Sequence, residues 1–129
     1  MQIIDGKKLA EKIKDEIVQE IVKLNGQRPN LAIILVGERQ DSKLYVSLKE
    51  KEAKKVGIDT HLYKCAESIS QNQLLEIIKC LNEDELIDAI LVQLPLPATF
   101  DTDIIIKAVT LSKDVDGFHP DNLEELLKS

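Results

Sequence analysis

The sequence has few of the residues on which several classes of protein depend. Only 3% of its 129 residues are aromatic and none is Trp, which argues against the base-stacking surfaces of single-strand nucleic-acid binders. Its net charge of −6 argues against broad contact with phosphate backbones. Its two cysteines, Cys65 and Cys80, cannot build a disulfide framework, and free thiols fit a reducing compartment. We therefore expect a cytoplasmic protein with no nucleic-acid partner.

Long apolar runs and targeting signals are missing as well. No apolar stretch approaches the roughly 20 residues that cross a bilayer, and residues 1–7 do not resemble a signal peptide because no basic region precedes an apolar core. The five glycines are widely separated, so neither G-x-G-x-x-G nor a P-loop can be found. We expect no membrane partner and no cradle for a pyrophosphate in this chain.

Two apolar patterns alternate along the chain. Helical spacing occurs in the segments 9–24, 41–56, 74–81 and 103–109. Short runs typical of strands lie between them, at 31–36, 58–62 and 89–92, and the first and last are apolar enough to be buried on both faces. Since 129 residues suit one domain, the order predicts a single three-layer α/β/α domain over 1–129 with a mainly parallel sheet. A further short amphipathic helix is predicted over 121–128.

Parallel sheets of this kind bind ligands at the carboxyl ends of their strands, which directs attention first to Tyr45 and Lys49. These residues lie one helical turn apart on the same face. We expect Tyr45, Leu48 and Ala53 to point toward the core, so that Lys49 lies at the border of an apolar surface. A lysine that loses hydration gives up its proton more easily and can act as an acid or base. The alternative is a structural pair, in which the lysine reaches past a packed tyrosine to solvent.

Gln93 leaves a predicted buried strand and is followed by Pro95 and Pro97. Its neutral amide can both donate and accept a hydrogen bond, so it could hold a lysine without forcing that lysine to stay protonated. The prolines fix the shape of the loop, and either X-Pro bond could be cis. The alternative is a strand that simply ends in a proline turn.

The segment from Lys113 to Pro120 contains Asp116-Gly117 within an Asp-x-Asp-Gly pattern. A calcium loop is excluded, because the closing carboxylate position of an EF-hand would fall on Leu123. Asp116 could instead accept hydrogen bonds from the N–H groups of a ligand, or it could form an Asx-turn. The histidines and cysteines have no zinc-ligand spacing, so we expect no metal.

Three motifs stand in a fixed order along the chain: Asp41-Ser42-x-x-Tyr45-Val46-x-x-Lys49, Val92-Gln93-Leu94-Pro95-Leu96-Pro97, and Lys113-Asp114-Val115-Asp116-Gly117-Phe118-His119-Pro120. Each motif alone is weakly specific. Together, with Val36-Gly37 before them, they resemble the catalytic domain of the methylenetetrahydrofolate dehydrogenase/methenyltetrahydrofolate cyclohydrolase family, over nearly the whole chain.

The resemblance implies an activity and a set of site residues. The family oxidises 5,10-methylenetetrahydrofolate with NADP and hydrolyses 5,10-methenyltetrahydrofolate to 10-formyltetrahydrofolate, with tetrahydrofolate as the carrier and no metal. It implies that Lys49 is the central catalytic residue, that Gln93 binds and tunes it, and that Asp116 anchors the pterin. Tyr45 would stack on the aminobenzoate ring. The other implied substrate-binding residues are Ser42, which would support the loop, and Leu94, Pro95 and Gly117.

The resemblance also implies a Rossmann-type nucleotide domain that binds NADP, forms one wall of the cleft and makes most of the dimer contact. This chain ends at Ser129, and Glu124 stands where the family usually carries a glycine. We therefore expect a monomeric domain that has no NADP-binding residues and no dehydrogenase activity and that retains at most the cyclohydrolase step. Two alternatives stay open, a non-catalytic folate-binding module and an unrelated flavodoxin-like interaction domain.

Overall fold

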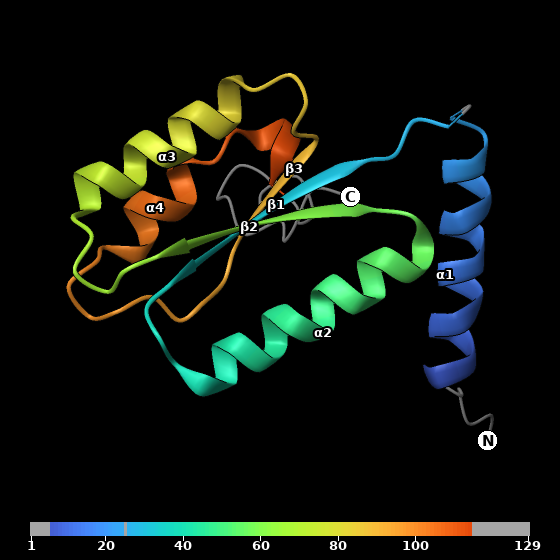
Figure 1. Ribbon diagram of the computed structural model, residues 1–129, viewed down its shortest axis with the longest axis horizontal. Coiled ribbons are helices and arrows are strands. Elements are labelled where there is room, and N and C mark those ends of the chain that lie inside the picture. Colours follow the sequence, from blue (N-terminus) through green and yellow to red (C-terminus); the bar gives the residue numbers. More distant parts are fainter. Residues whose placement is uncertain (1–5, 25, 115–129) are drawn as a thin grey trace, which may run out of the picture.

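The computed structural model describes residues 6–24 and 26–114 (Figure 1). The elements follow in the order α1 (Gly6–Val22), β1 (Asn30–Val36), α2 (Gln40–Val56), β2 (Asp59–Cys65), α3 (Gln71–Glu83), β3 (Ala89–Val92), α4 (Thr102–Ala108) and a 3-10 turn, η1 (Leu111–Lys113). The predicted alternation of helices and strands is confirmed over this part of the chain. The helix predicted over 121–128 lies outside the described residues.

The three strands form one parallel sheet in the order β2-β1-β3. β1 is the central strand, and its Ile34 is in register with Tyr63 of β2 and with Val92 of β3. In Figure 1, α3 and α4 lie on one side of the sheet and α2 on the other. The expected three-layer α/β/α architecture is therefore confirmed.

The apolar run of β1 is buried on both faces of the sheet. Ala32, Ile34 and Val36 belong to the larger apolar cluster, which includes residues of α3 and α4. Ile33 and Leu35 belong to a second cluster that contains Val46 of α2. Successive side chains of a strand point to opposite faces, so a strand covered on both sides needs an uninterrupted apolar sequence.

The face that α2 buries differs from the one expected. Tyr45 and Leu48 are exposed, at 53% and 48%, so the prediction that they point toward the core is wrong. Ala53 is buried as expected, and the helix packs through it and through Val46. Each residue turns an α-helix by about 100°. Tyr45, one position before Val46, and Leu48, two positions after it, therefore both lie outside the helix face that is centred on Val46.

The ends of α2 and α3 follow from local sequence. α2 ends at Gly57, whose left-handed conformation (φ 96°) is one that glycine adopts without steric cost. α3 begins at Ser70, whose side chain accepts a hydrogen bond from the backbone of Gln73, while the Gln73 side chain returns one to Ser70. This reciprocal arrangement is a capping box.

Helix α1 contacts the rest of the fold mainly through α2. Lys14 forms an ion pair with Glu52 of α2, and Ile21 packs beside Gly57. The apolar stripe of α1 is only partly covered, because Ile13 and Ile17 are 47% and 37% exposed. Among the described residues, no helix is long and apolar enough to cross a membrane.

Candidate active site

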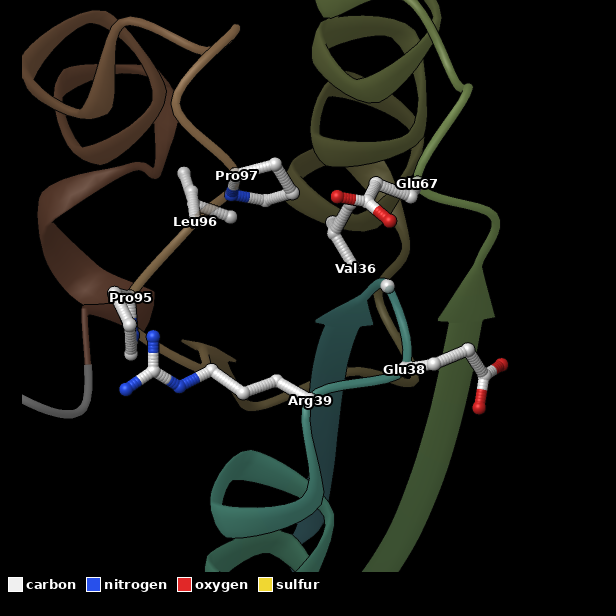
Figure 2. Close-up of a pocket in the computed structure, with 8 residues that line it drawn as sticks. Val36, Glu38, Arg39, Glu67, Pro95, Leu96 and Pro97 are labelled. Carbon is white, nitrogen blue, oxygen red and sulfur yellow. The ribbon is translucent and has the colours of Figure 1, made fainter.

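The loops that follow the three strands meet at the carboxyl edge of the sheet. They enclose a pocket of about 340 Å³, shown in Figure 2. Its lining comes from Val36 to Arg39 after β1, from Glu67 after β2 and from Pro95 to Pro97 after β3. Ligands of open parallel sheets bind at this edge, so the pocket lies where the sheet topology predicts a site.

Lys49 of α2 and Gln93 after β3 meet at this edge. The Nζ atom of Lys49 donates a hydrogen bond of 2.9 Å to Oε1 of Gln93. Gln93 is only 7% exposed, and its backbone N–H donates to the carbonyl of Ile34 in β1. The central strand thereby fixes the backbone from which the amide projects.

The amide of Gln93 has a defined orientation. Its Nε2 donates a 2.9 Å hydrogen bond to the carbonyl oxygen of Leu94, which leaves Oε1 to face Lys49. In this bond the lysine therefore meets a neutral acceptor and not a carboxylate. An uncharged partner can hold a lysine in place through either of its protonation states, which is what a group that moves protons requires.

Tyr45 lies one turn before Lys49 on α2, with a ring that is 53% exposed. Its exposure leaves the ring accessible to a flat ligand. The next residue of the set, Ser42, is 2% exposed, and its backbone N–H donates to the carboxylate of Asp41 in the first turn of the helix. Its Oγ is buried, and no hydrogen-bond partner for it is found among the described residues.

Leu94 and Pro95 are joined by a cis peptide bond. Pro95 lines the pocket, while Leu94 is half-buried and supplies the carbonyl that orients Gln93. The two remaining residues implied by the motifs, Asp116 and Gly117, lie outside the described residues. The structure thus brings Lys49, Gln93 and Pro95 to one edge of the sheet.

Two ion pairs stand where β1 passes into α2. Nε of Arg39 lies 2.6 Å from Oδ1 of Asp41, and Lys43 pairs with Glu38. The hydrogen bond from Lys43 lowers the pKa of Glu38, and that from Arg39 lowers the pKa of Asp41. In Figure 2 the side chain of Arg39 points toward the side of the pocket formed by Pro95, whereas that of Glu38 points away.

Sequence reasoning missed Arg39 and Glu67 as pocket residues. Glu67 follows an edge strand in a loop that carries no recognisable motif. The rule that ligands bind at the carboxyl ends of strands would have found it, had it been applied to the end of the second predicted strand as well. Among residues 11–24 and 26–114, no group of three or more His, Cys, Asp or Glu side chains is placed to hold a metal ion.

An open parallel sheet with a pocket at its carboxyl edge and a lysine–amide pair nearby is the arrangement found in α/β domains that bind small molecules at this edge. Residues 4–116 match the model of one family, the catalytic domain of tetrahydrofolate dehydrogenase/cyclohydrolase. The chain belongs to this family.

Similar proteins and structures agree with this assignment. The bifunctional protein FolD of Nautilia profundicola is 48% identical over 130 residues, which are 99% of this chain and 46% of that protein. The crystal structure of the FolD methylenetetrahydrofolate dehydrogenase/cyclohydrolase from Campylobacter jejuni has a TM-score of 0.90 at 44% identity, and the match covers 95% of this chain and 44% of that one. The Trypanosoma brucei enzyme, solved with NADP cofactor and an inhibitor, has a TM-score of 0.88 at 34% identity, covering 97% and 43%. The chain thus spans about half the length of the relatives it matches.

Proposed function

We propose that this chain is the folate-binding catalytic half of a methylenetetrahydrofolate dehydrogenase/cyclohydrolase and that Lys49 is its central catalytic residue. The observation that carries the proposal is the 2.9 Å hydrogen bond from Lys49 to the nearly buried amide of Gln93, in a chain of this family. The site suits hydrolysis of the 5,10-methenyl bridge, because this step needs only water as a reactant and a group that assists its proton transfer.

In the hydrolytic step, water adds to the one-carbon bridge and gives up a proton, and Lys49 assists this proton transfer. The hydroxyl group of this adduct then loses its proton as the C=O bond forms, the bond from that carbon to N5 breaks, N5 gains a proton, and the formyl group stays on N10. A lysine that stayed charged throughout would repel the methenyl cation. Gln93 supports the step because its Oε1 holds the amine in place without adding a negative charge.

The substrate would lie across the carboxyl edge of the sheet. Tyr45, exposed beside Lys49, would stack on the aminobenzoate ring, and Asp116 would accept hydrogen bonds from the pterin. Leu94 and Pro95 would form the wall on the β3 side, with Gly117 near Asp116. Ser42 would support the start of α2 against the loop that follows β1.

The described residues do not fit a binding site for NADP. The turn from β1 into α2 has a single glycine, Gly37, followed by Glu38 and Arg39, which are engaged in ion pairs. A dinucleotide turn needs several glycines so that the backbone can approach the pyrophosphate. We therefore derive no hydride transfer from this chain. Alone, it would be a cytoplasmic monomer that performs at most the cyclohydrolase step.

The proposal is tested by absorbance-monitored hydrolysis of 5,10-methenyltetrahydrofolate. Lys49→Met should lose at least about 100-fold of the acceleration over the uncatalysed rate, as expected when a general acid–base group is removed. Lys54→Met is the matched control, since Lys54 is an exposed lysine of the same helix, and it should retain the wild-type rate.

Exposure of Lys49 also supports the second candidate, a folate-binding module without turnover. A wild-type rate equal to the uncatalysed one, together with saturable binding of the same folate, would favour that candidate. Absence of both hydrolysis and binding would contradict the proposed function.

A further inference from the structure

Arg39, the residue that precedes the first turn of α2, is held in place through one side of its guanidinium. Its Nε donates to Oδ1 of Asp41 at 2.6 Å, and the same oxygen accepts from the backbone N–H of Ser42 at 2.8 Å. A guanidinium has five N–H donors. Among residues 11–24 and 26–114, the hydrogen bond found for the Arg39 side chain uses only the donor on Nε. The two Nη groups therefore remain for a ligand.

The guanidinium of Arg39 lies on the same edge of the sheet as the proposed catalytic lysine. Arg39 and Pro95 both line the pocket, and Figure 2 shows the arginine side chain extending toward that proline. Pro95 comes two residues after Gln93, whose Oε1 accepts the hydrogen bond from Lys49. The Arg39 side chain is 62% exposed, so a ligand that enters this edge from solvent can reach it.

The charges around Arg39 suit a carboxylate. Arg39 is the only cationic residue among the described ones that line the pocket, and it stands at the N-terminal end of α2, where the helix dipole is positive. Glu38 is paired with Lys43 and points away from the pocket in Figure 2. The remaining acid, Glu67, lies on the opposite side of the pocket from the guanidinium. The planar pair of Nη groups matches the two oxygens of a carboxylate.

The spacing of residues along α2 fits the length of a folate. Tyr45 and Lys49 come six and ten positions after Arg39, which is about 9 and 15 Å along the helix axis. With the one-carbon bridge at Lys49 and the aminobenzoyl ring on Tyr45, the substrate runs toward the start of α2, and its glutamate comes next. Eight bonds of about 1.3–1.5 Å separate N10 from the α-carboxylate carbon, which allows a span of about 9 Å. The Arg39 side chain covers the remaining distance.

We propose that Arg39 is a specificity-determining residue whose two Nη groups bind a carboxylate of the glutamate moiety of the folate. Asp41 is then a positioning residue, because its hydrogen bond to Nε turns the Nη groups toward the pocket. This inference rests on the proposed function and adds the part of the substrate that the pocket in Figure 2 recognises.

The test compares two ligands that the chain does not turn over. One is tetrahydrofolate, and the other is the N-methylamide of tetrahydropteroate, which keeps the aminobenzamide but has neither carboxylate of the glutamate. Kd for each is measured by calorimetric titration under nitrogen. The wild-type chain should bind tetrahydrofolate about fivefold more tightly than the amide, the size expected for an ion pair at an exposed arginine. Added salt should reduce this preference, because it screens exposed charges.

Arg39→Met should remove the preference, and Arg28→Met is its matched control. Arg28 is also an exposed arginine whose Nε bonds to an aspartate, Asp59, at 2.9 Å, but it precedes β1 and so lies at the opposite edge of the sheet. Arg39→Met should raise Kd for tetrahydrofolate about fivefold and leave Kd for the amide unchanged. Arg39→Lys should recover only part of the loss, because an ammonium group cannot present the same pair of donors. Arg28→Met should change neither value.

Several results would overturn the inference. An equal rise of Kd for both ligands in Arg39→Met would show a general effect on the edge of the sheet, and an unchanged Kd for tetrahydrofolate would show no contact. The wild-type comparison does not depend on the folding of any variant. Equal wild-type affinity for the two ligands contradicts the role of Arg39 and leaves the proposed function standing, whereas absence of binding to both contradicts the proposed function as well.

Discussion

Replacement of Gly57 by Ala tests how α1 is attached to the domain. Gly57 has a φ of 96°, and a Cβ atom there would lie 3.2 Å from Cγ2 of Ile21 in α1. Carbon atoms in good contact are about 3.5–4.0 Å apart. Gly57→Ala is therefore destabilised by two separate effects, a left-handed backbone conformation and a contact that is too close.

Gly26→Ala isolates the first effect. Gly26 has a φ of 86°, but a Cβ atom there would meet nothing within 4 Å. Alanine in this conformation costs roughly 1–2 kcal/mol, and the stiffer unfolded chain offsets about 0.4–1 kcal/mol of it. We expect a loss of about 1 kcal/mol in the free energy of unfolding at Gly26. At Gly57 we expect about 2–4 kcal/mol, because overpacking adds roughly 1–3 kcal/mol to that loss.

Urea denaturation followed by far-UV circular dichroism measures both losses. The Ile21→Ala background provides the decisive comparison, because it removes Cγ2 and with it the close contact. In that background Gly57→Ala should cost no more than Gly26→Ala does. If the cost at Gly57 is the same with and without the Ile21 side chain, the contact between α1 and the end of α2 is not its cause, and the reasoning is refuted.

Three further predictions concern single groups. Burial raises the pKa of the Cys65 thiol, whereas Cys80 is exposed, so a thiol reagent near pH 8 should modify Cys80 first; faster reaction of Cys65 in single-cysteine variants would contradict this. The hydrogen bond from Lys14 lowers the pKa of Glu52 below its ordinary value of 4.5. The stability it contributes is therefore present above pH 4.5 and is lost as pH falls through the lowered folded-state pKa. Glu52→Gln should flatten this part of the pH–stability curve, and an unaltered curve would refute the assignment. Ile34→Ala, at a core position with no exposure, should lower the free energy of unfolding by about 2–5 kcal/mol in a urea titration, and a loss below about 1 kcal/mol would show that the core refills the space.

The fold could be predicted where one local pattern decides the structure. The continuous apolar run of β1 indicated burial on both faces, because an alternating strand would have placed polar groups in one of the two clusters. The cap of α3 is formed by residues three positions apart, so adjacent sequence contains all that it needs. The contact between Lys49 and Gln93 was implied by the resemblance of the three motifs to the family, and the structure places Nζ of Lys49 2.9 Å from Oε1 of Gln93.

The remaining features depend on contacts that no short pattern contains. Tyr45 and Leu48 are apolar, yet α2 packs on the sheet through the side that carries Val46. The periodicity of the sequence alone does not say which of two apolar sides of a helix is covered. Lys113 reaches carbonyl groups 29 to 32 residues earlier in the chain. Neither its residue type nor its neighbours distinguish it from a solvated lysine, so its role becomes visible only once α3 and η1 are placed in space.

The hydrogen bond between Lys49 and Gln93 joins residues that are 44 positions apart. One partner stands on the helix after the central strand, and the other follows the third strand, whose Gln93 backbone bonds to that central strand. The pair can therefore form only when α2 and the third strand have both docked on the central strand. In a partly folded chain, either residue alone cannot form this hydrogen bond. The Lys49–Gln93 pair is consequently a property of the completed sheet. We expect it to form and to be lost with the global folding of the sheet, and not with the looser docking of α1.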